Sequence, residues 1–180
     1  MNKVEETRGL FILFSSLFSN VGKAKPLFLT LLFAAAVSAG VLTYQSLQKD
    51  FETLDGEAYR WHDLQGQWVV INYFAPWCAP CLREMPELAS FYQSRPDNTQ
   101  LFAINYDPKT KSELISMTKE FGISVPVIIS NADTKLPMAK PPYLPATYIV
   151  GPDGKIKDTL MGEITAASLR QRLSELKDAG

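Results

Sequence analysis

The apolar residues of this chain follow two different spacings. Residues 68–75 (WVVINYFA) and 101–107 (LFAINYD) are short, mostly apolar runs rich in β-branched and aromatic residues, which is typical of buried strands. Residues 81–94 and 108–122 instead carry apolar residues three or four positions apart, which predicts helices, and Gly122 is a typical stop for the second. In that second helix the residues expected to face inward are Leu114, Ile115, Thr118 and Phe121.

The C-terminal part of the chain predicts a hairpin and a last helix. The segments 146–150 (ATYIV) and 155–162 (KIKDTLMG) flank the turn sequence GPDG. Residues 165–178 place three leucines on one helical stripe: Leu169, Leu173 and Leu176. The resulting order β, α, β, α, β, β, α predicts an α/β domain over residues 51–180, with a central mixed sheet and helices on both faces.

The first fifty residues have a different pattern. Residues 26–44 contain no charged side chain, and a membrane-spanning helix needs roughly 20 predominantly apolar residues. Lys23 and Lys25 directly precede this run, and such basic residues stay on the cytoplasmic side. The pattern predicts a cytoplasmic segment 1–25, a transmembrane signal-anchor 26–45, a linker 46–50 and an exported domain 51–180.

Two other interpretations of the apolar run remain open. A buried core helix is seldom so uniformly apolar. A cleavable signal peptide is the stronger alternative, because Val37-Ser38-Ala39 offers small residues where a signal peptidase cuts. Both the anchor and the signal peptide would export the rest of the chain.

Charge and cysteine content narrow the function. Eighteen basic and nineteen acidic residues give a formal net charge of -1, so no basic field would attract nucleic acid. Two cysteines are too few for a disulfide scaffold. Cys78 and Cys81 therefore need a local explanation.

The two cysteines lie where a predicted strand ends and a helix begins. Backbone N–H groups are unpaired there and the helix dipole is positive, which stabilises the reactive thiolate. Cys78 is nearer the helix tip and is expected to be the attacking thiol, whereas Cys81, one turn deeper, would resolve the mixed disulfide. Pro80 has no N–H and suits the first turn of a helix.

Other uses of a cysteine pair fit less well. Structural zinc usually needs four ligands, and the chain has no third cysteine and one histidine, His62. Attachment of a c-type haem needs a histidine after the second cysteine, where Leu82 stands. A purely structural disulfide remains open, although so small a loop would stabilise little through chain entropy.

The segment FAPWCAPCLREMP resembles the active site of the thioredoxin superfamily, and most of all the membrane-anchored TlpA- and ResA-type thiol:disulfide oxidoreductases of bacteria. Trp77 precedes the first cysteine as in that family, and YLPATYIV matches the segment with the family's cis-proline, which would be Pro145. The resemblance covers residues 51–180 and implies a thioredoxin-like fold whose redox group is the cysteine pair itself, without a bound cofactor or metal.

The resemblance also implies roles for the neighbouring residues. Trp77, Leu144 and Pro145 would bind substrate, with the Leu144 backbone accepting an extended client as an added strand. Ala79 and Pro80, between the cysteines, would tune the redox potential.

Glu84 is a further candidate catalytic residue. It follows Cys81 by almost one helical turn, can approach the sulfurs from below, and could accept or return the Cys81 proton. An exposed helix position is the alternative. Thioredoxins proper carry a buried aspartate six residues before the first cysteine, where this chain has Asn72. Because an amide cannot transfer a proton, this departure makes Glu84 more important.

These residues predict thiol–disulfide exchange by a single-pass protein of the bacterial inner membrane, with its N-terminus cytoplasmic and its catalytic domain periplasmic. The resemblance implies reduction of exported proteins such as apocytochrome c or metal-site cysteines, with electrons from a membrane donor of the DsbD or CcdA type. A monomer is expected. An oxidising member of the same fold and a tethered binding or chaperone module that does not turn over remain the alternatives.

Overall fold

The computed structural model describes residues 28–44 and 48–179. The chain divides into two compact units, Met1–Gln48 and Lys49–Gly180.

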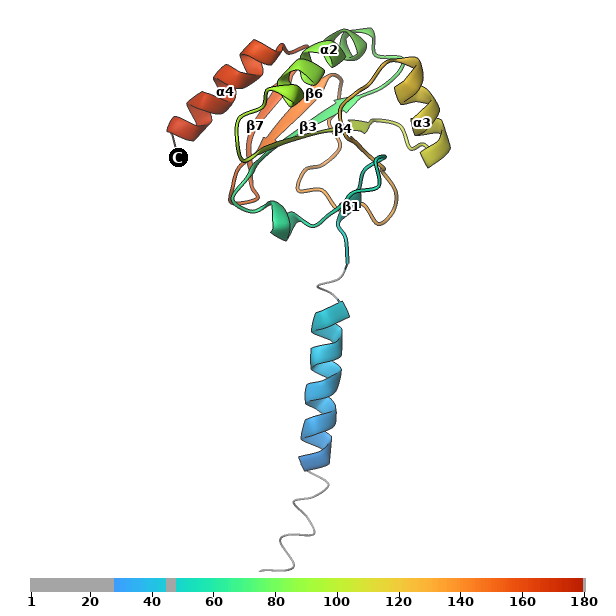
Figure 1. Ribbon diagram of the computed structural model, residues 1–180, viewed down its shortest axis with the longest axis vertical. Helices are drawn as coiled ribbons and strands as arrows, with labels where there is room; N and C mark the ends of the chain where they lie inside the picture. The colour runs from blue at the N-terminus through green and yellow to red at the C-terminus, as the bar shows by residue number, and fades with distance from the viewer. Residues whose placement is uncertain (1–27, 45–47, 180) are drawn as a thin grey trace, which may run out of the picture. The chain divides into compact units, whose positions relative to one another are not determined.

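The first unit contains a helix over residues 28–44 (Figure 1). The side chains of this helix are exposed. Two of its hydroxyl groups bond within the helix: Ser38 donates to the Ala34 carbonyl at 2.8 Å and Thr43 donates to the Ala39 carbonyl at 2.7 Å. Among the described residues, no helix has both the length and the apolar character needed to cross a membrane. The predicted segment 1–25, both ends of the predicted anchor and part of the predicted linker lie outside the described residues.

The second unit contains two sheets, one 3-10 helix and three α-helices (Figure 1). Its elements in chain order are β1 (Phe51–Glu52), β2 (Ala58–Tyr59), η1 (Trp61–Leu64), β3 (Trp68–Phe74), α2 (Ala79–Gln93), β4 (Thr99–Asn105), α3 (Lys111–Glu120), β5 (Val127–Ile128), β6 (Ala146–Val150), β7 (Ile156–Met161) and α4 (Ala166–Asp178).

The main sheet is mixed, as predicted, and has the strand order β5-β4-β3-β6-β7. The neighbours β3–β4 and β4–β5 are parallel, whereas β3–β6 and β6–β7 are antiparallel. The central strand β3 is almost continuously buried, which explains its unbroken apolar sequence.

The two faces of the sheet are covered differently. Leu88 of α2, Leu114 of α3 and Leu169 of α4 all belong to one core cluster, so the three α-helices share a face (Figure 1). The other core cluster contains Leu64 of η1 and Met138 of the β5–β6 loop. The sequence predicted helices on both faces. The three α-helices cover one face only, and on the other face the helical cover is the 3-10 helix η1. The crossovers β3–α2–β4 and β4–α3–β5 step in the same direction, and right-handed crossovers then place both helices on the same side.

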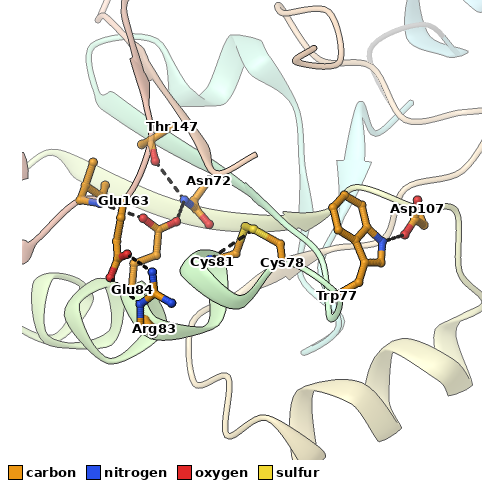
Figure 2. The surroundings of a disulfide bond; sticks show 10 residues. Asn72, Trp77, Cys78, Cys81, Arg83, Glu84, Asp107, Thr147 and Glu163 are labelled. Carbon is orange, nitrogen blue, oxygen red and sulfur yellow. Dashed lines mark hydrogen bonds and ion pairs between the residues drawn. A yellow bond between two sulfur atoms is a disulfide. The ribbon is translucent and has the colours of Figure 1, made fainter. Parts of the chain in front are cut away.

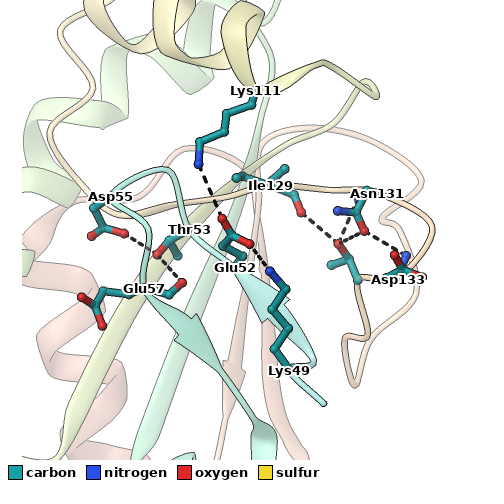
Figure 3. Close-up of polar contacts among 10 residues, drawn as sticks. Lys49, Glu52, Thr53, Asp55, Glu57, Lys111, Ile129, Asn131 and Asp133 are labelled. Atoms are coloured by element: carbon teal, nitrogen blue, oxygen red, sulfur yellow. Dashed lines mark hydrogen bonds and ion pairs between the residues drawn. The ribbon is translucent and has the colours of Figure 1, made fainter. Parts of the chain in front are cut away.

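The segment around β1 protects the sheet edge at β5. Thr53 forms an antiparallel bridge with Ile128, and the Leu54 N–H donates to the Val127 carbonyl at 2.9 Å. Figure 3 shows Glu52 of β1 facing Lys49 and, across to α3, Lys111, whose ammonium lies 3.5 Å from the carboxylate. The segment thus pairs an edge that would otherwise be open to another strand.

The largest departure from the sequence prediction is in α3. Leu114 is buried as expected, together with Met117, but Ile115 and Phe121 are 49% and 36% exposed and Thr118 is half-buried. The helix ends at Glu120 and contacts the sheet through a narrow stripe, so neighbouring apolar positions stay outside. The two-residue strands β1, β2 and β5 are too short to produce an apolar pattern in the sequence.

Candidate active site

The cysteine pair lies at the start of α2, beyond the carboxyl end of β3. Cys78 is the N-cap residue, and the Cys81 N–H donates to its sulfur at 3.3 Å. The two sulfurs form a disulfide with Cα atoms 5.2 Å apart (Figure 2). Ala79 and Pro80 make up the first residues of the helix between them, so Pro80 occupies a position that needs no N–H donor. After reduction, the same N–H would stabilise a Cys78 thiolate.

The two cysteines differ slightly in access. Cys78 is 5% exposed and Cys81 is fully buried, and both belong to the core cluster on the helix-covered face. This order agrees with Cys78 as the attacking thiol and Cys81 as the resolving thiol. Their apolar surroundings oppose formation of a thiolate, against the stabilising helix terminus.

Trp77 projects from the surface next to the disulfide and is 64% exposed. Its indole N–H donates to the Asp107 carboxylate at 2.7 Å (Figure 2), and its ring stands edge-on to Tyr106 with 6.0 Å between centroids. The Lys140 ammonium lies 3.5 Å from the centre of the Tyr106 ring. The predicted substrate-binding tryptophan is therefore held by the loop after β4, and this loop in turn contacts the segment before Pro145.

The Leu144–Pro145 peptide bond is cis, as predicted. Pro145 is buried, while Leu144 is half-buried and packs against the cluster that contains both cysteines. The Pro145 carbonyl accepts a hydrogen bond from the Gly162 N–H at 2.9 Å, which ties this loop to the end of β7. Leu144 thus packs on the core that contains the disulfide, and its contact with a client chain stays a prediction.

Glu84 is completely buried, not an exposed helix residue. Its Oε1 accepts from the Asn72 amide at 2.7 Å and its Oε2 accepts from the Ile164 N–H at 2.9 Å (Figure 2). Burial raises the pKa of Glu84 to about 7, against the lowering effect of these two hydrogen bonds, and the charge of Glu163 raises it further. A carboxyl with this pKa is suited to exchange protons near neutral pH.

Asn72 connects Glu84 to the sheet. The side chain stands on the helix-covered face of β3, and its Nδ2 donates both to Glu84 and to the Thr147 hydroxyl on β6 at 2.9 Å. In Figure 2 the Asn72 amide lies between the Glu84 carboxyl and the disulfide. The Glu84 carboxyl thus bonds to Asn72 and to Ile164, and its approach to the sulfurs stays a prediction.

An exposed ion pair covers the outer side of this network. Arg83 and Glu163 approach to 2.7 Å, with their side chains 62% and 41% exposed. An exposed ion pair of this kind contributes little to stability. Arg83 thereby pairs with Glu163 and not with Glu84. Glu84 therefore remains without a cationic partner among the described contacts.

The sequence interpretation did not assign Tyr106, Asp107, Lys140 or Thr147 to the site. One signal was present for Asp107, which directly follows the second strand. Carboxyl ends of neighbouring parallel strands meet at one sheet edge, where α/β proteins place their sites. Within residues 28–44 and 48–179, no cluster of three or more histidine, cysteine or acidic side chains could hold a metal ion.

Comparisons with known proteins show the family of this chain. The profile of the AhpC/TSA family matches residues 45–159. The thiol-disulfide oxidoreductase ResA of Geobacillus thermodenitrificans is 32% identical over 128 residues, which cover 69% of this chain and 71% of that protein. ResA of Bacillus subtilis is 25% identical over 127 residues, with 70% of each chain covered.

Solved structures give the same fold. StoA from Bacillus subtilis superposes with a TM-score of 0.58 at 22% identity, covering 67% of this chain and 92% of StoA. DsbF from MTB superposes with a TM-score of 0.55 at 21% identity, covering 72% of this chain and 96% of DsbF. With a disulfide at the start of α2 and a cis peptide bond before Pro145, the chain belongs to the AhpC/TSA family and is a thiol-disulfide oxidoreductase of thioredoxin-like fold.

Proposed function

We propose that this protein is a membrane-anchored, periplasmic reductase of disulfides in exported proteins. The observation that carries the reductive direction is the buried Glu84 carboxyl beside the cysteine pair. The first turn of α2, Ala79–Leu82, has no charged residue that would offset the effect of this carboxyl on the cysteine pair. Strong oxidants of this fold owe their potential to a stabilised reduced form, whereas a carboxylate and apolar burial disfavour the thiolate here.

The reaction proceeds in two exchanges. The Cys78 thiolate attacks a client disulfide, the client S–S bond breaks, and one client thiolate leaves from the mixed disulfide. Cys81 then loses its proton and attacks Cys78, which releases the second client thiolate and forms the Cys78–Cys81 disulfide. Two electrons have passed to the client, and Glu84 is the proposed acceptor of the Cys81 proton.

The surface beside the disulfide supports a protein client. Trp77 offers an exposed apolar face, and the Leu144 backbone before cis-Pro145 would pair with an extended client segment. Apocytochrome c and proteins with metal-binding cysteine pairs are the proposed clients. A membrane donor of the DsbD or CcdA type would re-reduce the pair, and the proposed anchor at 26–45 would keep the domain near it.

The reduction potential tests the direction. The Cys78–Cys81 pair is equilibrated with mixtures of reduced and oxidised glutathione, and the redox state is read by thiol alkylation. A potential of roughly -230 mV or lower is expected, whereas a value near the -120 mV of strong oxidants would overturn the reductase proposal in favour of an oxidase.

Trapping tests the client reaction. Cys81→Ser should accumulate mixed disulfides between Cys78 and clients, and the matched variant Cys78→Ser should trap none. Full activity of Cys78→Ser in cells would instead favour a tethered binding module that does not turn over.

A further inference from the structure

In the buried amide of Asn72, the nitrogen donates two hydrogen bonds, whereas the oxygen has no partner among the described residues. Its Nδ2 donates to Glu84 at 2.7 Å and to Thr147 at 2.9 Å, which accounts for both amide hydrogens. Its Oδ1 is buried and accepts no hydrogen bond from the described residues. A buried acceptor without a donor costs roughly 1–3 kcal/mol, so this atom destabilises the disulfide form.

The place of this acceptor suggests its partner. Asn72 belongs to the same face of β3 as Val70 and Phe74, which contribute to the cluster that contains Cys81. Figure 2 shows the amide between the Glu84 carboxyl and the disulfide. Reduction breaks the S–S bond and adds two electrons and two protons, so that Cys81, which is fully buried, gains an S–H donor at this location.

We propose that Asn72 Oδ1 accepts the hydrogen of the Cys81 thiol in the reduced protein, which makes Asn72 a positioning residue that joins Cys81 to Glu84 and sets the reduction potential. The inference rests on the proposed function in one respect: it takes Cys81 as the buried thiol of the redox pair. The charged groups around the amide are Glu84, Glu163 and Arg83, and the last two pair with each other at the surface.

The two sides of the amide act together. Donation from Nδ2 to the Glu84 carboxylate polarises the amide and makes Oδ1 a stronger acceptor. A proton on the Cys81 thiol is therefore favoured while Glu84 is ionised. The amide itself does not transfer a proton. Through its two hydrogen bonds, however, the protonation of the Cys81 thiol and that of the Glu84 carboxyl depend on each other.

The test is the equilibrium between dithiol and disulfide forms at pH 7 in Asn72→Leu. The disulfide form loses an unpaired acceptor and the dithiol form loses a bond, so both effects favour oxidation. We expect the equilibrium constant for oxidation by glutathione to rise about fivefold, which corresponds to about 20 mV.

The same substitution in a Glu84→Gln background separates the direct contact from an effect through Glu84. If Oδ1 bonds to Cys81, Asn72→Leu still shifts the equilibrium toward oxidation in that background, by less than fivefold because a neutral glutamine side chain polarises the amide less. A shift that vanishes there would overturn the inference. Thr99→Val, a buried polar residue at the opposite end of the sheet, is the control for a general loss of stability and should leave the equilibrium unchanged.

A measurement without substitution at Asn72 covers the case in which Asn72→Leu does not fold. The 13Cγ resonance of Asn72 should move on reduction of the wild-type protein and keep the shifted position in Cys78→Ser, where Cys81 is a thiol. An unchanged resonance would overturn the inference. Neither experiment depends on whether the wild-type potential is reducing or oxidising, so a failed reductase proposal would leave this result interpretable.

Discussion

At the scale of single residues, Glu84 should make stability depend on pH. Its pKa in the folded protein is about 7, above the ordinary 4.5, so the folded state binds this proton more tightly than the unfolded state. Stability contributed by the proton is therefore lost as the pH rises from about 4.5 to about 7, by on the order of 3 kcal/mol. Glu84→Gln should lack this loss. Urea unfolding of both oxidised proteins at pH 4.5 and pH 8 measures this loss. An equal change in the free energy of unfolding between the two pH values in both proteins would contradict the raised pKa.

Asp107 should control the orientation of Trp77, because the indole N–H donates to its carboxylate at 2.7 Å. Asp107→Ala should let the exposed indole move, at a cost of about 1 kcal/mol or less, and shift the indole N–H resonance toward its solvent-exposed value. Asp107→Asn keeps an acceptor and should change the resonance less. Trp61, whose indole N–H donates to the Lys135 carbonyl at 2.8 Å, provides the unchanged reference in the same spectrum. An unaffected Trp77 signal would refute the restraint.

The sequence predicted the residues whose chemistry depends on near neighbours in the chain. Cys78 and Cys81 were found from their spacing and from the strand-to-helix junction, and Pro145 from its local motif. The contact between Trp77 and Asp107 joins residues 30 positions apart. Glu84 was a candidate, but its burial depends on Ile164, 80 residues later, and no local pattern reports such a partner.

At the scale of elements, long segments with a clear period were predicted well and short ones were not. The strands β3, β4, β6 and β7 and the helices α2 and α4 agree with the predicted segments, because each buries enough apolar residues to show its periodicity. The two-residue strands β1 and β5 bury too few residues to show a period, and each is defined by its pairing with another strand, β2 and β4 respectively. The choice of face for α3 follows from the direction of the crossover, which no single segment contains.

Gly162 connects two elements of the site and should be sensitive for that reason. It has a positive φ of 98°, with open space where a Cβ would lie, and its N–H holds the Pro145 carbonyl. Gly162→Ala should destabilise the protein by about 1 kcal/mol and also shift the reduction potential, because Ile164, two residues later, donates to Glu84. Gly154→Ala, with φ 74° and equal space in the β6–β7 turn, should cost similar stability. A shifted potential in both variants would show that the effect is not specific to the site.

At the scale of the whole molecule, both core clusters lie within the second unit, so the redox domain should not need the first unit to fold. A fragment of residues 49–180 should therefore keep the melting temperature and the glutathione equilibrium of the full chain. Expressed with residues 1–48 in a bacterium, the domain should sediment with membranes and resist carbonate extraction, since the apolar run 26–44 would hold it there. The fragment alone should remain in the soluble fraction. If the full chain is instead released at a mass that lacks the first 39 residues, cleavage after Ala39 replaces the anchor, and the domain would meet its electron donor by diffusion.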